Sequence, residues 1–391
     1  MGFILSDLRL SVPSRFEMEL LEKFGRFNKK YGSIDKIYGS LPSSIIGHGR
    51  IAGLVKKFGD FDMNYVREFT EEAHRIGIRV NYLANTLCLG EVGYTNDGRE
   101  KILSYLGEVY ETGADIITVA SPYIHRLVKT EYPSLKTEIS VYAEIDTVQK
   151  FKRWEELGAD IINLPSRANR DFELLESIAK SRKTEVELLV NESCLFHCPY
   201  SLYHHTVSSH RSRIPDDGVD YCMLECVQDR LEDPSELLKA AWIRPEDIAY
   251  YEKNYGIDRY KIQGRQMPVQ WIEKTVEAYS TRKYSGNLLD LISPTYPDWS
   301  ACSAANQQTL PGFQPQDLKR PDVYIDNSQL DRFFTTLVKK GGCAPTKPCD
   351  TCRYCNQASK NLVQIRNQEQ FKTYAAATKA LFEHAITAST A

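Results

Sequence analysis

The stretch Glu185-Val-Glu-Leu-Leu-Val-Asn191 is a short run of apolar and β-favouring residues that leads directly into a cysteine-containing segment. Runs of this length, bounded by polar or glycine residues, are typical of β-strands. Seven others occur along the chain: Arg9–Pro13, Asp35–Ser40, Arg79–Asn85, Ile116–Ser121, Lys136–Val141, Asp160–Pro165 and Arg259–Gln263. The run that begins at Glu185 is therefore the seventh of eight predicted strands.

Amphipathic helical stretches separate many of these strands. They place apolar residues three or four positions apart, and glycine ends several of them: Phe16–Lys29, Met63–Gly77, Arg99–Gly113, Ile145–Gly158 and Asp171–Arg182. Alternating strands and helices predict an α/β protein with a parallel sheet. Eight such strands predict a closed, TIM-like (β/α)8 barrel. The alternative is an open doubly wound sheet, although no glycine-rich phosphate-binding motif follows the first strand.

The chain is predicted to have three parts. Residues 1–284 form the barrel, which the helix Val269–Thr281 closes, and a cysteine-rich insertion at 192–258 follows the seventh strand. Residues 285–322 are rich in Pro, Ser, Gln and Asn and are predicted to be an irregular linker. Residues 323–391 form a small C-terminal cysteine-rich extension, with helices at Leu330–Lys340 and Gln370–Thr387. Because barrel active sites lie in the loops after the strands, the insertion is where we expect the chemistry.

The composition is that of a soluble globular protein, with 42% hydrophobic and 26% charged residues in 391. No apolar run approaches the roughly 18 residues that a membrane span needs, so we expect a cytoplasmic protein without one. Of the 49 basic and 52 acidic residues, eleven basic and six acidic ones lie at 318–391. The main body is therefore negative, which disfavours long RNA as a partner. A small-molecule substrate is expected instead; an electron-transfer partner and self-association are left open.

Eight of the ten cysteines fall into two short windows, a pattern that indicates metal binding. The first set is Cys194, Cys198, Cys222 and Cys226, two C-x3-C pairs that begin just after the seventh strand. Sulfur ligands select zinc or iron–sulfur clusters over magnesium or calcium. The spacing is less typical of zinc knuckles, so an iron–sulfur cluster is favoured, with zinc and unligated thiols as the alternatives.

The second set is Cys343, Cys349, Cys352 and Cys355, and it contains the C-x2-C-x2-C core found in bacterial ferredoxins. It predicts a second [4Fe–4S] cluster, with a zinc knuckle as the alternative. The fourth ligand is Cys343 or Cys302. Two clusters would indicate a redox enzyme, whereas zinc would only order the tail.

Several motifs resemble the collagenase-like peptidase U32 family, over roughly residues 30–280. They are Leu83-Ala-Asn85-Thr86, Gly113-Ala-Asp115, the seventh strand leading into the cysteines, and Lys261-Ile-Gln-Gly264-Arg265, which resembles the family's Lys-Ile-Glu-Gly-Arg signature. The resemblance implies a TIM-like barrel with a [4Fe–4S] cluster on the four cysteines of the first set. It also implies kinship with proteins of oxygen-independent ubiquinone, tRNA and rRNA hydroxylation, some of which take oxygen from prephenate. Gln263 stands where the family has Glu.

Polar residues near the ends of the predicted strands are the candidate site. Glu192 is placed as a general acid or base, and Arg265 as the ligand of a carboxylate such as those of prephenate, with structural ion pairs as the alternative. His205 and His210 are candidates for hydrogen bonds to cluster sulfurs or to an anionic substrate, His205 in a catalytic and His210 in a substrate-binding role. Asn85 and Gln263 are predicted substrate-binding residues at the rim.

These features together favour an iron–sulfur oxidoreductase or hydroxylase. The expected chemistry is oxygen-independent redox or hydroxyl transfer on a small aromatic molecule or a nucleobase, with prephenate as a candidate oxygen donor. One alternative is a noncatalytic iron–sulfur or zinc partner that binds or delivers a substrate within a complex. Another is a metal-dependent peptidase, but the sequence contains neither His-Glu-x-x-His nor Gly-x-Ser-x-Gly.

Overall fold

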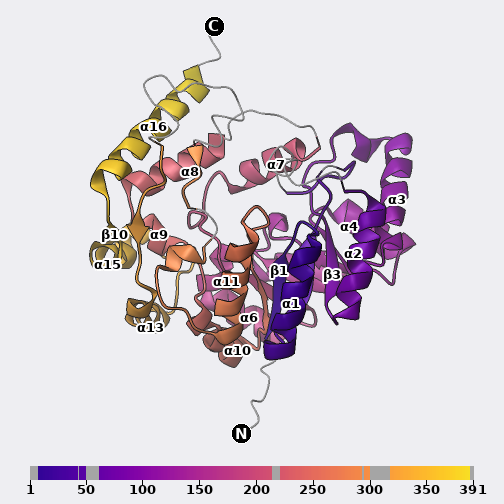
Figure 1. Cartoon of the computed structure of the whole chain (residues 1–391), viewed down its shortest axis with the longest axis horizontal. Coiled ribbons are helices and arrows are strands. Elements are labelled where there is room, and N and C mark those ends of the chain that lie inside the picture. The colour runs from indigo at the N-terminus through magenta and orange to yellow at the C-terminus, as the bar shows by residue number, and fades with distance from the viewer. Residues whose placement is uncertain are drawn as a thin grey trace. The chain divides into compact units, whose positions relative to one another are not determined.

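Eight parallel strands close into a barrel in the computed structural model, which describes residues 8–42, 44–49, 61–213, 221–292, 295–299 and 318–387. The strands follow one another in chain order around the barrel (Figure 1). Their bounds are β1 Arg9–Pro13, β2 Ile34–Gly39, β3 Arg79–Ala84, β4 Ile116–Val119, β5 Lys136–Ile139, β6 Ile161–Leu164, β7 Glu185–Leu189 and β8 Arg259–Lys261. The predicted TIM-like (β/α)8 fold is confirmed, and the open sheet is excluded because β8 pairs with β1.

A helix follows each strand of the barrel. These helices are α1 Met18–Tyr31, α2 Met63–Arg75, α3 Asn96–Glu111, α4 Pro122–Glu131, α5 Val148–Glu156, α6 Phe172–Ser181, α10 Ile248–Tyr255 and α11 Val269–Thr281. Four begin at side-chain caps, on Asp62, Thr95, Thr147 and Asp171, each of which accepts a hydrogen bond from a backbone N–H in the first turn. Such caps satisfy N–H groups that the helix itself leaves unpaired.

Two barrel helices, α4 and α10, were not expected from the sequence. α4 has Pro122 at its start and buries Ile124, Leu127 and Val128. Within the predicted insertion, α10 is the helix that completes the β/α unit of β7. The barrel part of the chain therefore resumes well before residue 258. The cysteine-bearing part of the insertion carries α7 Ser201–Arg211, α8 Tyr221–Glu232 and α9 Glu236–Lys239.

The chain divides into two compact units. The first contains residues 1–191, 205–216 and 243–283, which include the whole barrel. The second contains residues 192–204, 217–242 and 284–391. Both cysteine sets therefore belong to the second unit, whereas the sequence had grouped the first set with the barrel and the second with a separate extension.

The second unit has its own hydrophobic core, built from the insertion and the C-terminal part of the chain. Its C-terminal elements are β9 Val323–Tyr324, α13 Asp331–Lys339, α14 Cys349–Cys352, α15 Tyr354–Leu362, β10 Gln364–Ile365 and α16 Gln368–Thr387. α16 packs along α8, as Figure 1 shows. The predicted linker supplies Leu288, Ile292, Tyr296, Trp299 and Leu318 to this core. Its described residues are irregular, but they are packed.

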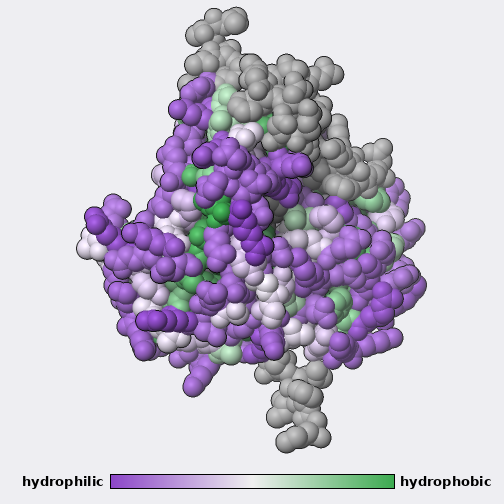
Figure 2. Space-filling model, turned by 60° about the vertical axis from the view of Figure 1, so that its left-hand side comes forward, coloured by the Kyte–Doolittle hydropathy of each residue, from purple (hydrophilic) through white to green (hydrophobic). Residues whose placement is uncertain are grey.

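No helix in the described ranges is long and apolar enough to cross a membrane. The face seen in Figure 2 is largely hydrophilic, with a narrow apolar strip. Large apolar side chains are exposed at a few positions: Tyr94, Tyr110, Tyr123, Leu202, Tyr203 and Tyr221.

Candidate functional site

Hydrogen bonds join three loops at the carboxyl end of the barrel. Asn85 follows β3, and its Nδ2 donates to Ser140 Oγ (3.1 Å) in the loop after β5. The Gly49 N–H, in the loop after β2, donates to Asn85 Oδ1 (3.3 Å), and the Gly49 carbonyl accepts a bond from the Tyr142 hydroxyl (2.6 Å). Loops at this end of a barrel are where substrates bind. The structure places Asn85 in such a network.

Tyr142 and His205 form a stacked ring pair beside this network. Their ring centroids are 3.9 Å apart and their planes are 16° from parallel. His205 Nδ1 lies 3.2 Å from Glu144 Oε1, and Arg167 forms ion pairs with Glu144 and Asp146. The side chains of His205, Glu144 and Arg167 are all mostly buried, at 15–16% exposure. The imidazole is thus held between an aromatic face and a carboxylate.

An ion pair with Arg167 fixes the Glu144 carboxylate that faces His205. Burial disfavours the charge on Arg167, but the Glu144 carboxylate outweighs burial and raises the pKa of the guanidinium. Glu144 itself has a φ of +51°, in the left-handed region that non-glycine residues seldom adopt. A carboxylate that orients a histidine ring is the usual support of a histidine acid or base.

Arg265 and Gln263 lie just after β8. Arg265 is 7% exposed, and its Nη1 donates to Ser40 Oγ (2.6 Å), which follows β2. The Gln263 N–H donates to Asn191 Oδ1 (2.8 Å), and Asn191 Nδ2 donates to the Gln263 carbonyl (3.1 Å). The amide of Asn191 therefore ties the ends of β7 and β8 together. A buried guanidinium next to a hydroxyl can bind a carboxylate by donating hydrogen bonds to it.

Glu192 and His210 are two further predicted site residues. Glu192 belongs to the second unit, where its charge acts on the Cys194 thiol. His210 lies on α7 and is exposed. The structure thus brings Asn85 and His205 into one network, gives Arg265 and Gln263 partners just after β2 and β7, and places Glu192 with the cysteines.

The first cysteine set lies in the second unit, and none of the nine described cysteines forms a disulfide. The Cys226 thiol influences the pKa of both Cys194 and Cys198. Cys222 is buried one helical turn before Cys226 on α8. In the described ranges, no three Cys, His, Asp or Glu side chains already surround a point where a metal would sit. Four thiols on adjacent segments nevertheless have the donor chemistry that an iron–sulfur cluster or zinc requires.

Desolvation is the main influence on these thiols. Cys194 is accessible to solvent but densely surrounded by protein, which raises its pKa well above the ordinary value; the Glu192 charge adds to this. Burial likewise raises the pKa of Cys198. Metal binding requires the thiolate form, so ligation would release protons here.

Arg230, which the sequence analysis did not single out, is buried beside these cysteines. Its Nη1 donates to Cys226 Sγ (3.4 Å) and to the Thr295 carbonyl (3.3 Å), and its Nη2 donates to the Ser193 carbonyl (2.7 Å). Burial opposes its charge, but Cys226 and Cys194 outweigh burial and raise the pKa of the guanidinium. Its signal in the sequence is its position four residues after Cys226, on the same face of a helix.

The second cysteine set lies on α14 and α15 of the same unit, and Cys343 precedes them. Burial raises the pKa of Cys349, and the Cys352 thiol adds to this rise. The charge of Lys239 on α9 opposes it. Cys355 Sγ lies 3.8 Å from the Leu238 carbonyl. Arg353, with φ +50°, turns the chain between Cys352 and Cys355. Cys302, the other candidate ligand, lies outside the described residues.

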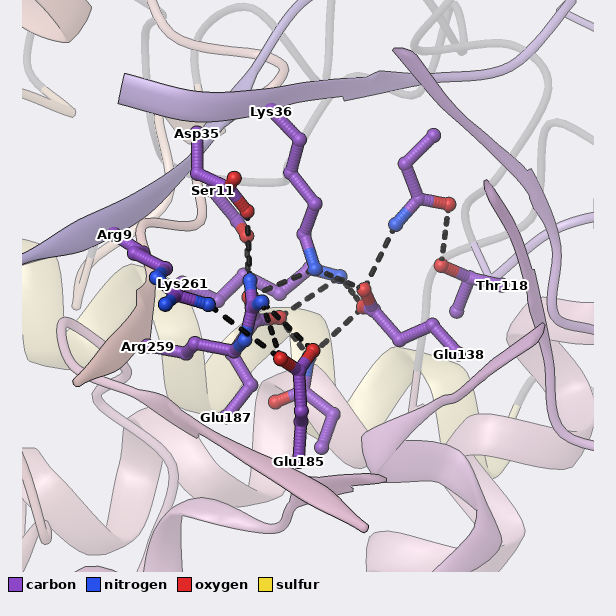
Figure 3. Close-up of polar contacts among 12 residues, drawn as sticks. Arg9, Ser11, Asp35, Lys36, Thr118, Glu138, Glu185, Glu187, Arg259 and Lys261 are labelled. Atoms are coloured by element: carbon purple, nitrogen blue, oxygen red, sulfur yellow. Dashed lines mark hydrogen bonds and ion pairs between the residues drawn. The ribbon is translucent and has the colours of Figure 1, made fainter. Parts of the chain in front are cut away.

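The barrel interior holds a polar layer that the sequence analysis also missed. Figure 3 shows Lys36, Lys261, Glu138 and Glu187 pointing toward one another inside the barrel. Each strand supplies one buried polar residue to this layer: Ser11, Lys36, Asn81, Thr118, Glu138, Asn163, Glu187 and Lys261. Desolvation opposes the charge of Glu138, but Lys261 and Lys36 outweigh it and lower its pKa. Desolvation and the Glu138 charge raise the pKa of Glu187.

Comparison with known proteins places the chain in a family. Residues 33–286 match Peptidase family U32. An uncharacterized protease of Methanocaldococcus jannaschii is 26% identical over 365 residues, which cover 91% of this chain and 99% of that protein. Among solved structures, a U32 peptidase is 20% identical at a TM-score of 0.48 and covers 68% of this chain and 96% of its own. A thiamine phosphate pyrophosphorylase from Pyrococcus furiosus is 12% identical at a TM-score of 0.35, covering 72% of this chain and 97% of its own.

The family match includes β2 to β8 and the whole first cysteine set, whereas the second set lies beyond it. Because the match spans more than half of the chain, the protein belongs to Peptidase family U32.

Proposed function

We propose that this protein is an iron–sulfur enzyme that carries out oxygen-independent redox or hydroxyl-transfer chemistry on a small aromatic molecule or a nucleobase. The observation that carries the proposal is the placement of Cys194, Cys198, Cys222 and Cys226 in one unit, with Cys226 Sγ 3.4 Å from the buried Arg230 guanidinium. When bound there, a [4Fe–4S] cluster supplies electrons or a Lewis-acidic iron. Cys222 completes the four ligands.

The barrel end would bind and orient the substrate. Arg265, with Ser40 beside it, offers charge-assisted hydrogen bonds to a carboxylate such as those of prephenate, the proposed oxygen donor. The Tyr142 and His205 rings, already stacked on each other, offer an aromatic surface. Glu144 and Arg167 hold His205, which would keep or move a proton at Nδ1.

The cysteine set and the barrel are joined through the chain itself. β7 ends at Leu189, and Cys194 follows five residues later. The carboxyl ends of barrel strands are the functional end in this fold. In the sequence, the proposed cluster ligands therefore begin in the segment that directly follows a barrel strand.

Anaerobic purification of the full chain, followed by iron, sulfide and zinc analysis and a visible absorption spectrum, tests the proposal. About four iron atoms per chain indicate one cubane and about eight indicate two. A colourless protein containing only zinc would contradict the redox function. Hydrolysis of casein or collagen by such a zinc form, lost in the presence of a chelator, would favour the peptidase that the family name suggests.

A further inference from the structure

We infer that Arg230 is a positioning residue for the centre bound by the first cysteine set, and that its fixed positive charge sets the reduction potential of that centre. The inference rests on the proposed function, because it requires an iron–sulfur cluster on these cysteines. It adds a role for a side chain that does not bind the metal.

Neutral acceptors hold the Arg230 side chain in place. Its Nη2 donates to the Ser193 carbonyl and its Nη1 to the Thr295 carbonyl, at 2.7 and 3.3 Å. Only 4% of the residue is exposed. Two carbonyl oxygens can orient the planar guanidinium without neutralising it. The positive charge therefore stays available to the neighbouring thiols.

The guanidinium faces the sulfur atoms. Arg230 lies one helical turn after Cys226, and its Nη1 donates to Cys226 Sγ at 3.4 Å. Its charge also acts on Cys194 and Cys198. Its Nε is buried and has no acceptor among the residues that the structure describes. An unused buried donor is costly, and a sulfur-bound anion nearby would offset that cost.

The nearby carboxylates have the opposite effect. Glu192 lies two residues before Cys194, and Asp229 precedes Arg230 on α8, so both place negative charge close to the proposed ligands in the chain. A cluster with four thiolate ligands is itself negative, and one-electron reduction adds one more negative charge. Buried charge without compensation is strongly destabilising. Arg230 should therefore stabilise the reduced cluster more than the oxidised one.

Cluster potentials depend on net charge and on hydrogen bonds to the sulfurs. Arg230 supplies a charge and, at Cys226, a hydrogen bond. Removing the charge while keeping a polar side chain should make the cluster harder to reduce. Keeping the charge on a different side chain should preserve most of the potential.

The test is a potentiometric titration of the anaerobic full-length protein with dithionite, followed by electron paramagnetic resonance. Iron analysis of the wild type comes first, because absence of iron there overturns the proposed function and this inference together. With iron present, Arg230→Gln should shift the oxidised-to-reduced ratio at a given potential at least tenfold toward the oxidised form, about 59 mV for one electron. Arg230→Lys should shift it less than half as far in millivolts.

Arg366→Gln is the matched control, because Arg366 lies in the same unit but stacks on Tyr324, with 3.6 Å between its guanidinium carbon and the ring centre. It should leave the potential unchanged. An unchanged potential in Arg230→Gln, with iron retained, overturns the inference and leaves the proposed function standing. If Arg230→Gln fails to fold, as circular dichroism would show, Arg230→Lys decides: a tenfold shift or loss of iron in that charged variant overturns the inference, and a near-wild-type potential supports it.

Discussion

Lys261 Nζ lies 2.6 Å from Glu138 Oε1 in the interior of the barrel. Glu138 is fully buried and also pairs with Lys36, while Asn81 and Asn163 donate to its two oxygens at 2.9 and 3.2 Å. A carboxylate satisfied on both oxygens can be tolerated in a barrel core. The core is therefore held by a charge network where TIM barrels commonly place branched apolar residues.

Breaking this network should strongly destabilise the barrel. Glu138→Gln removes one of the two buried carboxylates that Lys36 and Lys261 share, Glu187 being the other, and removing one partner of a buried pair costs about 3–5 kcal/mol. Glu156→Gln is the control, because its pair with Arg153 is exposed and such pairs contribute below about 1 kcal/mol. Urea unfolding of both variants measures the difference. Equal losses would show that the buried network contributes little.

The two buried glutamates should make stability depend on pH in opposite directions. The Glu138 pKa is lowered in the folded protein. Its contribution to the free energy of unfolding is therefore present above the ordinary glutamate pKa of about 4.3 and is lost as pH falls through the lowered folded value. The Glu187 pKa is raised, so its contribution is present below about 4.3 and is lost as pH rises through the raised folded value. Measured against Gln variants, the benefit of Glu138 should grow with pH and that of Glu187 should shrink.

Unfolding free energies at a series of pH values from about 2 to 8 test this relation, because the Glu138 contribution changes mainly below about 4.3. Each variant is compared with the wild type at the same pH, since titrating groups outside the network of Glu138, Glu187 and their two lysines then cancel to first order. Parallel curves for Glu138→Gln and Glu187→Gln would contradict the opposite pKa directions.

The barrel could be predicted from the sequence because the pattern of apolar and polar residues indicates which face each strand buries. The predicted strands begin within one residue of the observed ones, and most extend one or two residues too far, because the rim residues keep the same composition as the strands. The polar layer was readable in principle. Glu185-Val-Glu187-Leu alternates charged and apolar residues in a strand buried on both faces, which is unusual for a parallel sheet.

The candidate site was less accessible to sequence reasoning, because its residues come from separate loops. Tyr142 and Glu144 meet His205, and Arg167 meets Glu144, only through closure of the barrel, and no spacing rule links these separate loops. Periodicity also gave no reason to assign the first cysteine set to the same unit as the second. That grouping depends on a core shared by α8, α16 and the residues after Tyr284.

Each cysteine set should bind its metal independently. Cys226→Ser should remove one cluster's iron, and Cys352→Ser should remove the second cluster's iron or its zinc, each leaving the other set loaded. Cys88→Ser is the control, because Cys88 lies in the barrel unit outside both sets. Metal analysis of the anaerobically purified variants provides the measurement. Loss of all metal in either single variant would show that the sets form one joint site.

Arg265 should control the binding of a carboxylate substrate. Its guanidinium is buried and fixed by Ser40 Oγ at 2.6 Å, so it can offer hydrogen bonds to a carboxylate with little loss of side-chain freedom. A hydrogen bond to a charged group contributes about 1.5–3 kcal/mol, so Arg265→Gln should weaken prephenate binding roughly 10-fold to 150-fold in anaerobic calorimetry.

Arg126→Gln, on the exposed side of α4, should bind as the wild type does. Ser40→Ala should cause a smaller loss than Arg265→Gln, since it removes the support but keeps the charge. Equal affinity of the wild type and Arg265→Gln would contradict a role for Arg265 in binding, because nothing else in that variant could replace the lost charge.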